Sequence, residues 1–122
     1  MAQRPFTIIF FKETSGNQPV VTWLKKLDKN ERTQIGEDLQ TLQLRWPLGM
    51  PLVRPLGRKL WELRSNLGTR IARIIFVVYE SHIILLHGFI KKTQKTPLNE
   101  IEVALNRLKR LDVSTEDYHG IA

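Results

Sequence analysis

Hydrophobic residues in the first half of the chain follow one strand-like and two helix-like patterns. Residues 6–12 (FTIIFFK) are aromatic and β-branched, which predicts a strand, and residues 14–19 predict a turn. Pro19 suits the first turn of a helix, whose apolar side is formed by Val20, Trp23, Leu24 and Leu27. Asp28 and Glu31 fit a capping box that starts a second helix, with an apolar stripe at Ile35, Leu39, Leu42 and Trp46.

The second half of the chain alternates between turns and strands before a final helix. Residues 46–57 contain three prolines and two glycines, which predicts a connecting loop. Strands are expected at 59–67, 70–79 and 82–90, separated by turns at 65–68 and 80–81. In 59–67, Leu60, Glu62 and Arg64 share one side. Gly88 indicates a bulge or the close approach of another group.

Thr96 and Pro97 are typical of an N-cap and a first helical residue, so we expect a last helix that ends near residue 111. The predicted order is β-α-α-β-β-β-α. This order predicts an α+β domain over residues 1–111, with a small, mostly antiparallel sheet and its helices on one face. The polar segment 112–122 lacks periodicity and is expected to be a loose tail.

Composition excludes several classes of chemistry. The 122 residues contain no cysteine, and three scattered histidines offer no metal-ligand spacing, so we expect neither metal nor cofactor. There is no long apolar run and no signal for secretion, so we expect a cytoplasmic protein without a membrane partner.

Positive charge is concentrated in one third of the chain. Residues 54–95 contain nine basic and two acidic residues, which account for the whole net charge of +7. Such an excess favours a surface that binds a polyanion, although a solvated basic face is the plainer alternative.

In an antiparallel meander, Arg64, Arg70 and Arg73 lie at one end of the sheet, where Lys91 and Lys92 also arrive. The N-terminus of the last helix points there too, so these groups predict a phosphate site. We expect the arginines at exposed strand ends, so that Arg73→Ala leaves the fold nearly intact. His87 lies on a strand buried on both faces, where a core histidine and a proton-transfer residue are both open interpretations.

Residues 60–110 carry motifs that resemble the RelE/ParE toxin superfamily, and within it the HigB branch and its phage-derived relatives. These motifs are WELR at 61–64, Arg73 on the next strand, and HGF-x-KK-x-x-K-TP before a helix with E-I-x-x-A. The resemblance implies a RelE-like fold and the toxin of a type II toxin–antitoxin pair. Such toxins are ribonucleases that cut messenger RNA, usually on the ribosome, without metal, by attack of a 2′-hydroxyl on the adjacent phosphate.

The resemblance also implies roles for individual residues. The catalytic residues would be Arg64, Arg73, Lys91 and Lys92. Further RNA and phosphate contacts would come from Arg58, Lys59, Arg70, Lys95 and Thr96, and Glu62 and His87 are candidates for proton transfer. The chain departs from the best-known relatives at Leu60 and Glu62, where they carry lysines, and it has no tyrosine between Thr93 and Leu111.

The partners implied are messenger RNA, the ribosome and a HigA-like helix-turn-helix antitoxin, which alone would contact operator DNA. Two other functions stay open at this point. One is a gyrase inhibitor of the ParE type that acts without catalysis, and the other is an inactive nucleic-acid-binding module of the same fold.

Overall fold

A computed structural model describes residues 5–91 and 95–113. Its elements are β1 (Thr7–Phe10), α1 (Pro19–Lys25), α2 (Lys29–Arg45), β2 (Val53–Gly57), β3 (Leu60–Asn66), β4 (Ile71–Tyr79), β5 (His82–Lys91) and α3 (Leu98–Val113). Apart from the backbone of residues 112 and 113, the predicted tail at 112–122 lies outside the described residues.

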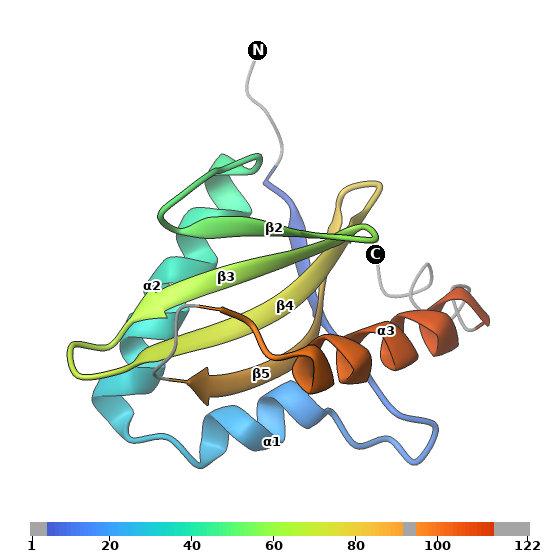
Figure 1. Ribbon diagram of the computed structural model, residues 1–122, viewed down its shortest axis with the longest axis horizontal. Coiled ribbons are helices and arrows are strands. Elements are labelled where there is room, and N and C mark those ends of the chain that lie inside the picture. The colour runs from blue at the N-terminus through green and yellow to red at the C-terminus, as the bar shows by residue number, and fades with distance from the viewer. Residues whose placement is uncertain (1–4, 92–94, 114–122) are drawn as a thin grey trace.

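The five strands form one mixed sheet in the order β1-β5-β4-β3-β2 (Figure 1). The hairpins β2–β3, β3–β4 and β4–β5 are antiparallel, and β1 joins the edge of β5 in parallel. The predicted α+β class and the three-strand meander are therefore confirmed. So is the capping box, in which Asp28 and Glu31 bond each other's backbone N–H at the start of α2.

One strand is missing from the sequence prediction. Residues 46–57 were expected to be a loop, but Val53–Gly57 form the edge strand β2. The prediction failed because of Pro55. Proline has no N–H for the hydrogen-bond ladder of a sheet and argues against an interior strand, but it is tolerated in an edge strand. Arg54 is thereby placed in the sheet, directly opposite Glu62 of β3.

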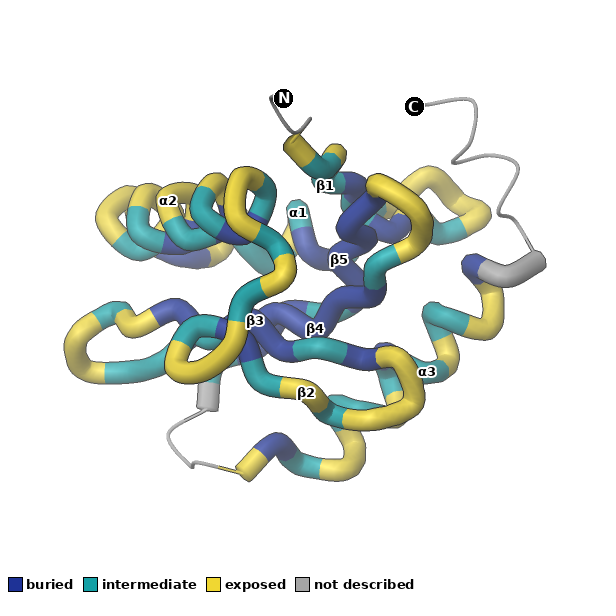
Figure 2. Tube along the Cα trace, turned by 90° about the horizontal axis from the view of Figure 1, so that it is seen from above, coloured by how far each residue is buried: buried dark blue, intermediate teal, exposed yellow. Residues whose placement is uncertain are grey.

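The helices cover both faces of the sheet, so their expected placement on one face is wrong. α1 and α2 lie behind the sheet and α3 lies in front of it (Figure 1), and Figure 2 shows the buried strands between α2 and α3. Two separate cores result. One joins α1 and α2 to Leu63, Ile74 and Phe76, and the other joins α3 to Ile75 and Val77.

Gly88 allows α1 to touch the sheet. A Cβ atom at this position would lie 2.3 Å from Cε3 of Trp23, which is closer than any side chain tolerates. The close approach predicted from the glycine is therefore confirmed, and Trp23 packs against the core as expected. A bulge is also present, two residues earlier. The β4–β5 register skips Leu86, so that Leu86 and His87 both lie on the α3 side.

Candidate functional site

Three arginines and one glutamate lie together on the α3 side of the sheet. Arg64 of β3 is directly opposite Arg73 of β4, and Arg54 of β2 is opposite Glu62 of β3. Their neighbours along the strands, such as Leu63, point into the α1/α2 core, so these side chains point the other way. We call Arg54, Glu62, Arg64 and Arg73 the arginine cluster.

The centre of the arginine cluster is buried. Glu62 and Arg73 are fully buried, and 11% of the Arg64 side chain is exposed. The hydroxyl of Thr96 donates a hydrogen bond of 2.5 Å to Oε2 of Glu62, and Nε of Arg64 lies 4.0 Å from Oε1. Arg73 was expected to be a surface charge, and this expectation is wrong, because Arg73 is fully buried on β4, between β3 and β5.

Electrostatically, the arginine cluster holds more positive than negative charge. Burial lowers the pKa of Arg73, the charge of Glu62 raises it, and the charges of Arg64 and Arg54 lower it again. The four residues of the cluster comprise three guanidinium groups and one carboxylate, which makes this part of the sheet basic. A partly desolvated excess of this kind attracts an anion, and guanidinium groups are suited to the oxygens of a phosphate.

Several predicted residues lie beside the arginine cluster. The backbone of Lys91 pairs with Ile71 at the end of β5, next to the strand position of Arg73, as predicted. Thr96 was expected to cap the last helix, but α3 begins at Leu98 and the Thr96 hydroxyl bonds Glu62 instead. Lys95 is exposed just before it. Lys92 and the side chain of Lys91 lie outside the described residues.

Other predicted residues lie elsewhere. Arg70 forms a two-pronged ion pair with Glu31 of α2, with N···O distances of 2.7 and 2.8 Å. This pair lowers the pKa of Glu31 and raises that of Arg70. Arg58 and Lys59 form the turn between β2 and β3, both with positive φ, at the opposite end of β3 from Arg64. The structure does not bring these three residues together with the arginine cluster.

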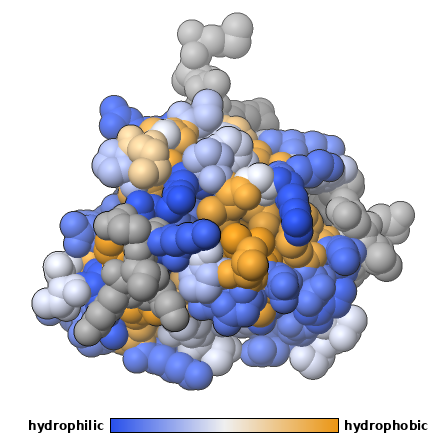
Figure 3. All heavy atoms as spheres, in the orientation of Figure 1, coloured by the Kyte–Doolittle hydropathy of each residue, from blue (hydrophilic) through white to orange (hydrophobic). Residues whose placement is uncertain are grey.

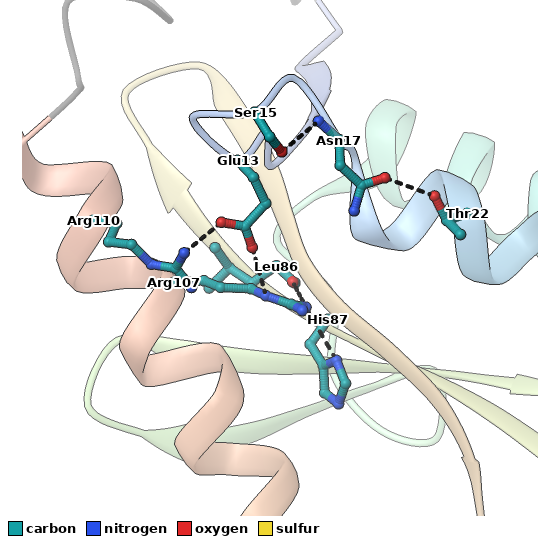
Figure 4. Close-up of polar contacts among 8 residues, drawn as sticks. All are labelled: Glu13, Ser15, Asn17, Thr22, Leu86, His87, Arg107 and Arg110. Carbon is teal, nitrogen blue, oxygen red and sulfur yellow. Dashed lines mark hydrogen bonds and ion pairs between the residues drawn. The ribbon is translucent and has the colours of Figure 1, made fainter.

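His87 is held on both ring nitrogens. Nδ1 lies 3.2 Å from Nη1 of Arg107 (Figure 4). Nε2 lies 2.9 Å from Oε1 of Glu100. Arginine only donates, so Nδ1 accepts and Nε2 carries the proton that Glu100 accepts. This arrangement describes a neutral imidazole. Burial lowers the pKa of His87, which favours the same neutral form, although the hydrogen bond to Glu100 opposes the shift.

The His87 network continues through α3 to the loop after β1. Arg107 also donates to the Leu86 carbonyl at 2.8 Å, and its Nε lies 3.8 Å from Glu13. Arg110 forms a close ion pair with the same glutamate (Figure 4). The network fixes α3 against the sheet, which favours a structural role for His87.

Sequence reasoning missed Arg54, Glu100 and Arg107. Arg54 was overlooked because its strand was read as a loop. The signal that identifies it is alternation, since Val53 is buried, Arg54 half-buried and Pro55 exposed. Glu100 and Arg107 lie seven residues apart, which places them on one side of a helix, but nothing in the sequence pairs that side with His87.

The part of the chain that the structure describes contains no group of three or more histidine, aspartate or glutamate side chains arranged to hold a metal ion. None of its helices is long and apolar enough to cross a membrane.

Comparison with known proteins identifies one family and two relatives. Residues 22–109 match the family described as Phage derived protein Gp49-like (DUF891). Two proteins named "Probable endoribonuclease HigB1" are similar to the chain, from the CDC 1551 / Oshkosh and ATCC 25618 / H37Rv strains of Mycobacterium tuberculosis. Each is 31% identical over 103 residues, which cover 82% of this chain and 80% of the relative. The resemblance predicted from the strand and helix motifs is thereby confirmed.

Proposed function

This chain belongs to the Gp49-like family of phage-derived proteins, and from that premise we propose that it is the toxin of a type II toxin–antitoxin pair. We propose further that it is an endoribonuclease that cuts messenger RNA on the ribosome, in the cytoplasm. The arginine cluster carries the proposal, because it gathers three guanidinium groups around one carboxylate on a chain whose relatives are named as endoribonucleases.

The proposed reaction needs positioning and charge stabilisation more than a strong nucleophile. The 2′-oxygen of one nucleotide forms a bond to the adjacent phosphorus, and the bond to the 5′-oxygen of the next nucleotide breaks. The 2′-hydroxyl loses a proton and the leaving oxygen gains one, which leaves a 2′,3′-cyclic phosphate. Negative charge grows on the phosphate oxygens in the transition state, where arginines stabilise it. As the resemblance implies, no metal ion takes part.

The burial of the arginine cluster suggests separate tasks for its members. Arg64 and Arg54 are partly exposed and are proposed to contact the phosphate. Arg73 lies behind Arg64 and is proposed to hold Glu62 and Arg64 in place and to add its charge to the site. Lys91, Lys92 and Lys95 remain proposed phosphate contacts, because they come from the segment between β5 and α3.

The resemblance implies Glu62 and His87 as candidates for proton transfer, and the contacts of the two side chains distinguish their roles. His87 is tied to Arg107 and Glu100, and its pKa is lowered by burial, which supports a structural role. Glu62 already accepts a hydrogen bond from Thr96 and faces arginines. We therefore propose Glu62 as the counter-ion of the arginine cluster, and we propose that one of the lysines at 91, 92 and 95 transfers the proton.

A cognate antitoxin is the partner expected for this family, and we propose a HigA-like helix-turn-helix protein. We propose that it covers the α3 side. On that side apolar side chains gather between the β2–β3 hairpin and α3, with hydrophilic ones around them (Figure 3). Leu98 of α3 is 74% exposed. Because the neighbouring chain is basic, the antitoxin segment that binds there should be acidic, and its affinity should fall as salt rises.

Expression of the chain alone in a bacterial host tests the proposed function. We expect growth to stop and incorporation of labelled amino acids into protein to fall within minutes of induction. Arg64→Ala should relieve both effects, and Lys25→Ala, on α1, should not. Normal growth at high levels of folded protein would contradict a toxin. Arrest that leaves translation intact but inhibits DNA supercoiling would indicate a gyrase inhibitor instead.

A further inference from the structure

A cavity of about 420 Å³ lies at the edge of the sheet, between α2 and the end of β3 that carries Arg64 and Asn66. The β2–β3 register ends at the pair Val53 and Leu63, and the Arg64 N–H donates to the Leu52 carbonyl at 2.8 Å. Beyond this point Ser65 and Asn66 pair only with β4. At this edge of β3, at the left of Figure 1, β2 therefore no longer separates the two faces of the sheet.

The walls of this cavity combine apolar and polar groups. Pro51, Leu52 and Ile71 supply apolar surface, and α2 contributes Gln34 and Asp38. The Ser65 hydroxyl donates to Oδ2 of Asp38 at 2.5 Å, and Nε2 of Gln34 lies 3.4 Å from both oxygens of this carboxylate. A carboxylate accepts about four hydrogen bonds, and the contacts from Gln34 are long at 3.4 Å. A ligand that displaces the Gln34 amide can therefore use both oxygens of the half-buried Asp38.

The size and chemistry of the cavity suit a planar ring that carries N–H groups. Small-molecule sites have volumes of about 300–1,000 Å³ and apolar walls with few polar groups, as here. Arg64 lines this cavity and also belongs to the arginine cluster. A ligand that places a ring beside Asp38 can therefore place a phosphate beside Arg64.

The geometry points to a binding site for one RNA base in the cavity lined by Gln34, Asp38 and Leu52, next to the phosphate held by the arginine cluster. This inference rests on the proposed function, because it supplies the base of the RNA that the arginine cluster would cleave. The RNA strand passes around the edge of β3, where β2 no longer covers it.

Asp38 determines which base fits best. A carboxylate only accepts hydrogen bonds, so it prefers a base with two adjacent N–H donors. Guanine has this pair on its Watson–Crick edge, at N1 and the exocyclic amine. Adenine and cytosine offer an amino group beside an acceptor, and uracil offers one N–H between two carbonyl oxygens. We therefore expect the order guanine, then adenine or cytosine, then uracil.

The test maps every cut in a mixed-sequence messenger RNA in a purified translation system. Asp38→Asn keeps an oxygen for Ser65 but presents an amide N–H to the base, so the share of cuts beside guanine should fall about tenfold. Glu37→Gln is the matched control, because Glu37 is an exposed carboxylate of α2 outside the cavity, and its cut profile should equal that of the parent. Gln34→Ala is a second variant that leaves the Ser65 contact intact and should shift the profile in the same direction.

The outcomes separate this inference from the proposed function. An unchanged cut profile in Asp38→Asn and Gln34→Ala, with active parent protein, overturns the base site and leaves the ribonuclease intact. If the parent cuts no RNA, guanosine 3′-monophosphate decides the question by nuclear magnetic resonance. Amide shifts at Asn66 and Ile71 that Asp38→Asn abolishes support the site, and unshifted amides in the parent overturn it.

Discussion

The two faces of the sheet are formed by the same strands but carry different kinds of side chains. The face under α1 and α2 is mostly apolar. Its polar contacts, Ser65 with Asp38 and Arg70 with Glu31, lie toward one end. The face under α3 is apolar only where α3 covers it. At the end where α3 begins, buried Glu62 and Arg73 replace the hydrophobic residues.

Because of this difference, we expect the α1/α2 face to serve stability and the charged end of the α3 face to serve function. Burying charges costs free energy unless they are paired, and a well-packed apolar cluster is usually at least as stable as a buried ion pair. The α1/α2 face shows that this sheet can be closed with hydrophobic residues and one buried hydroxyl, that of Ser65, and without a buried arginine. We therefore attribute the arginines where α3 begins to the proposed anion site, and substitutions on the two faces should have different consequences.

The largest effect is expected from Arg73→Ala. Its removal leaves Glu62 buried with less compensating charge, which should lower the free energy of unfolding by about 3 kcal/mol. Cleavage should be lost as well. Urea unfolding measures the first effect, and Arg73→Lys, which keeps the charge, should recover part of the stability. An unchanged unfolding midpoint in Arg73→Ala would show that the residue is not the buried counter-charge described above.

On the opposite face, Gly88→Ala should damage stability and spare the chemistry. The added methyl group meets the Trp23 ring, and overpacking of this kind costs about 1–3 kcal/mol. Activity per folded molecule should equal that of the parent. Combining Gly88→Ala with Trp23→Leu should cost less than the sum of the single changes, because both act on one contact. Additive costs in thermal unfolding would place the strain elsewhere.

A smaller effect involves pH and His87. Its pKa is lowered in the folded protein, so the unfolded chain takes up the proton first as pH falls. Stability from the neutral ring is complete above about pH 6.5 and decreases below it, until the lower folded pKa is passed. The charged groups that face His87 and its network are Glu13 and Glu100 on the acidic side and Arg107 and Arg110 on the basic side.

Melting temperatures between about pH 7.5 and 5.5 measure this dependence. The parent should lose stability across that range, and His87→Gln should lose less, because glutamine does not titrate. Equal slopes for the two proteins would mean that another group controls stability in this range.

The smallest effect is expected from Arg70→Ala at the rim of the α1/α2 face. The Arg70–Glu31 pair is partly exposed, and such pairs contribute little to stability. We expect a slight decrease in melting temperature and unchanged RNA cleavage. Cleavage that falls as far as in Arg64→Ala would move Arg70 into the functional site, as the sequence predicted.

Local features of the sequence predicted most of the fold. The capping box at Asp28 and the hairpin turns each depend on a few neighbouring residues. Gly88 indicated a close approach, but nothing near it in the sequence identified Trp23 as its partner. The strand β2 was not predicted, because Pro55 argues against a strand unless the strand lies at the edge of a sheet. The partner of Arg70 could not be predicted either, since Glu31 lies on another element and competes with phosphate for the guanidinium. Alternation placed Glu62 and Arg64 on one side of β3, but only the packing of α3 shows that Glu62 and Arg73 are buried.

The chemistry of the RNA ends tests the central claim most directly. Messenger RNA is incubated with ribosomes and purified parent, Arg64→Ala or Lys25→Ala protein, and the new 3′ ends are analysed. The parent and Lys25→Ala should produce 2′,3′-cyclic phosphate ends, and Arg64→Ala should produce them about 10²–10³ times more slowly at the same melting temperature. Ends with a free 3′-hydroxyl, or equal rates for Arg64→Ala and the parent, would contradict an arginine cluster that stabilises internal attack on the phosphate.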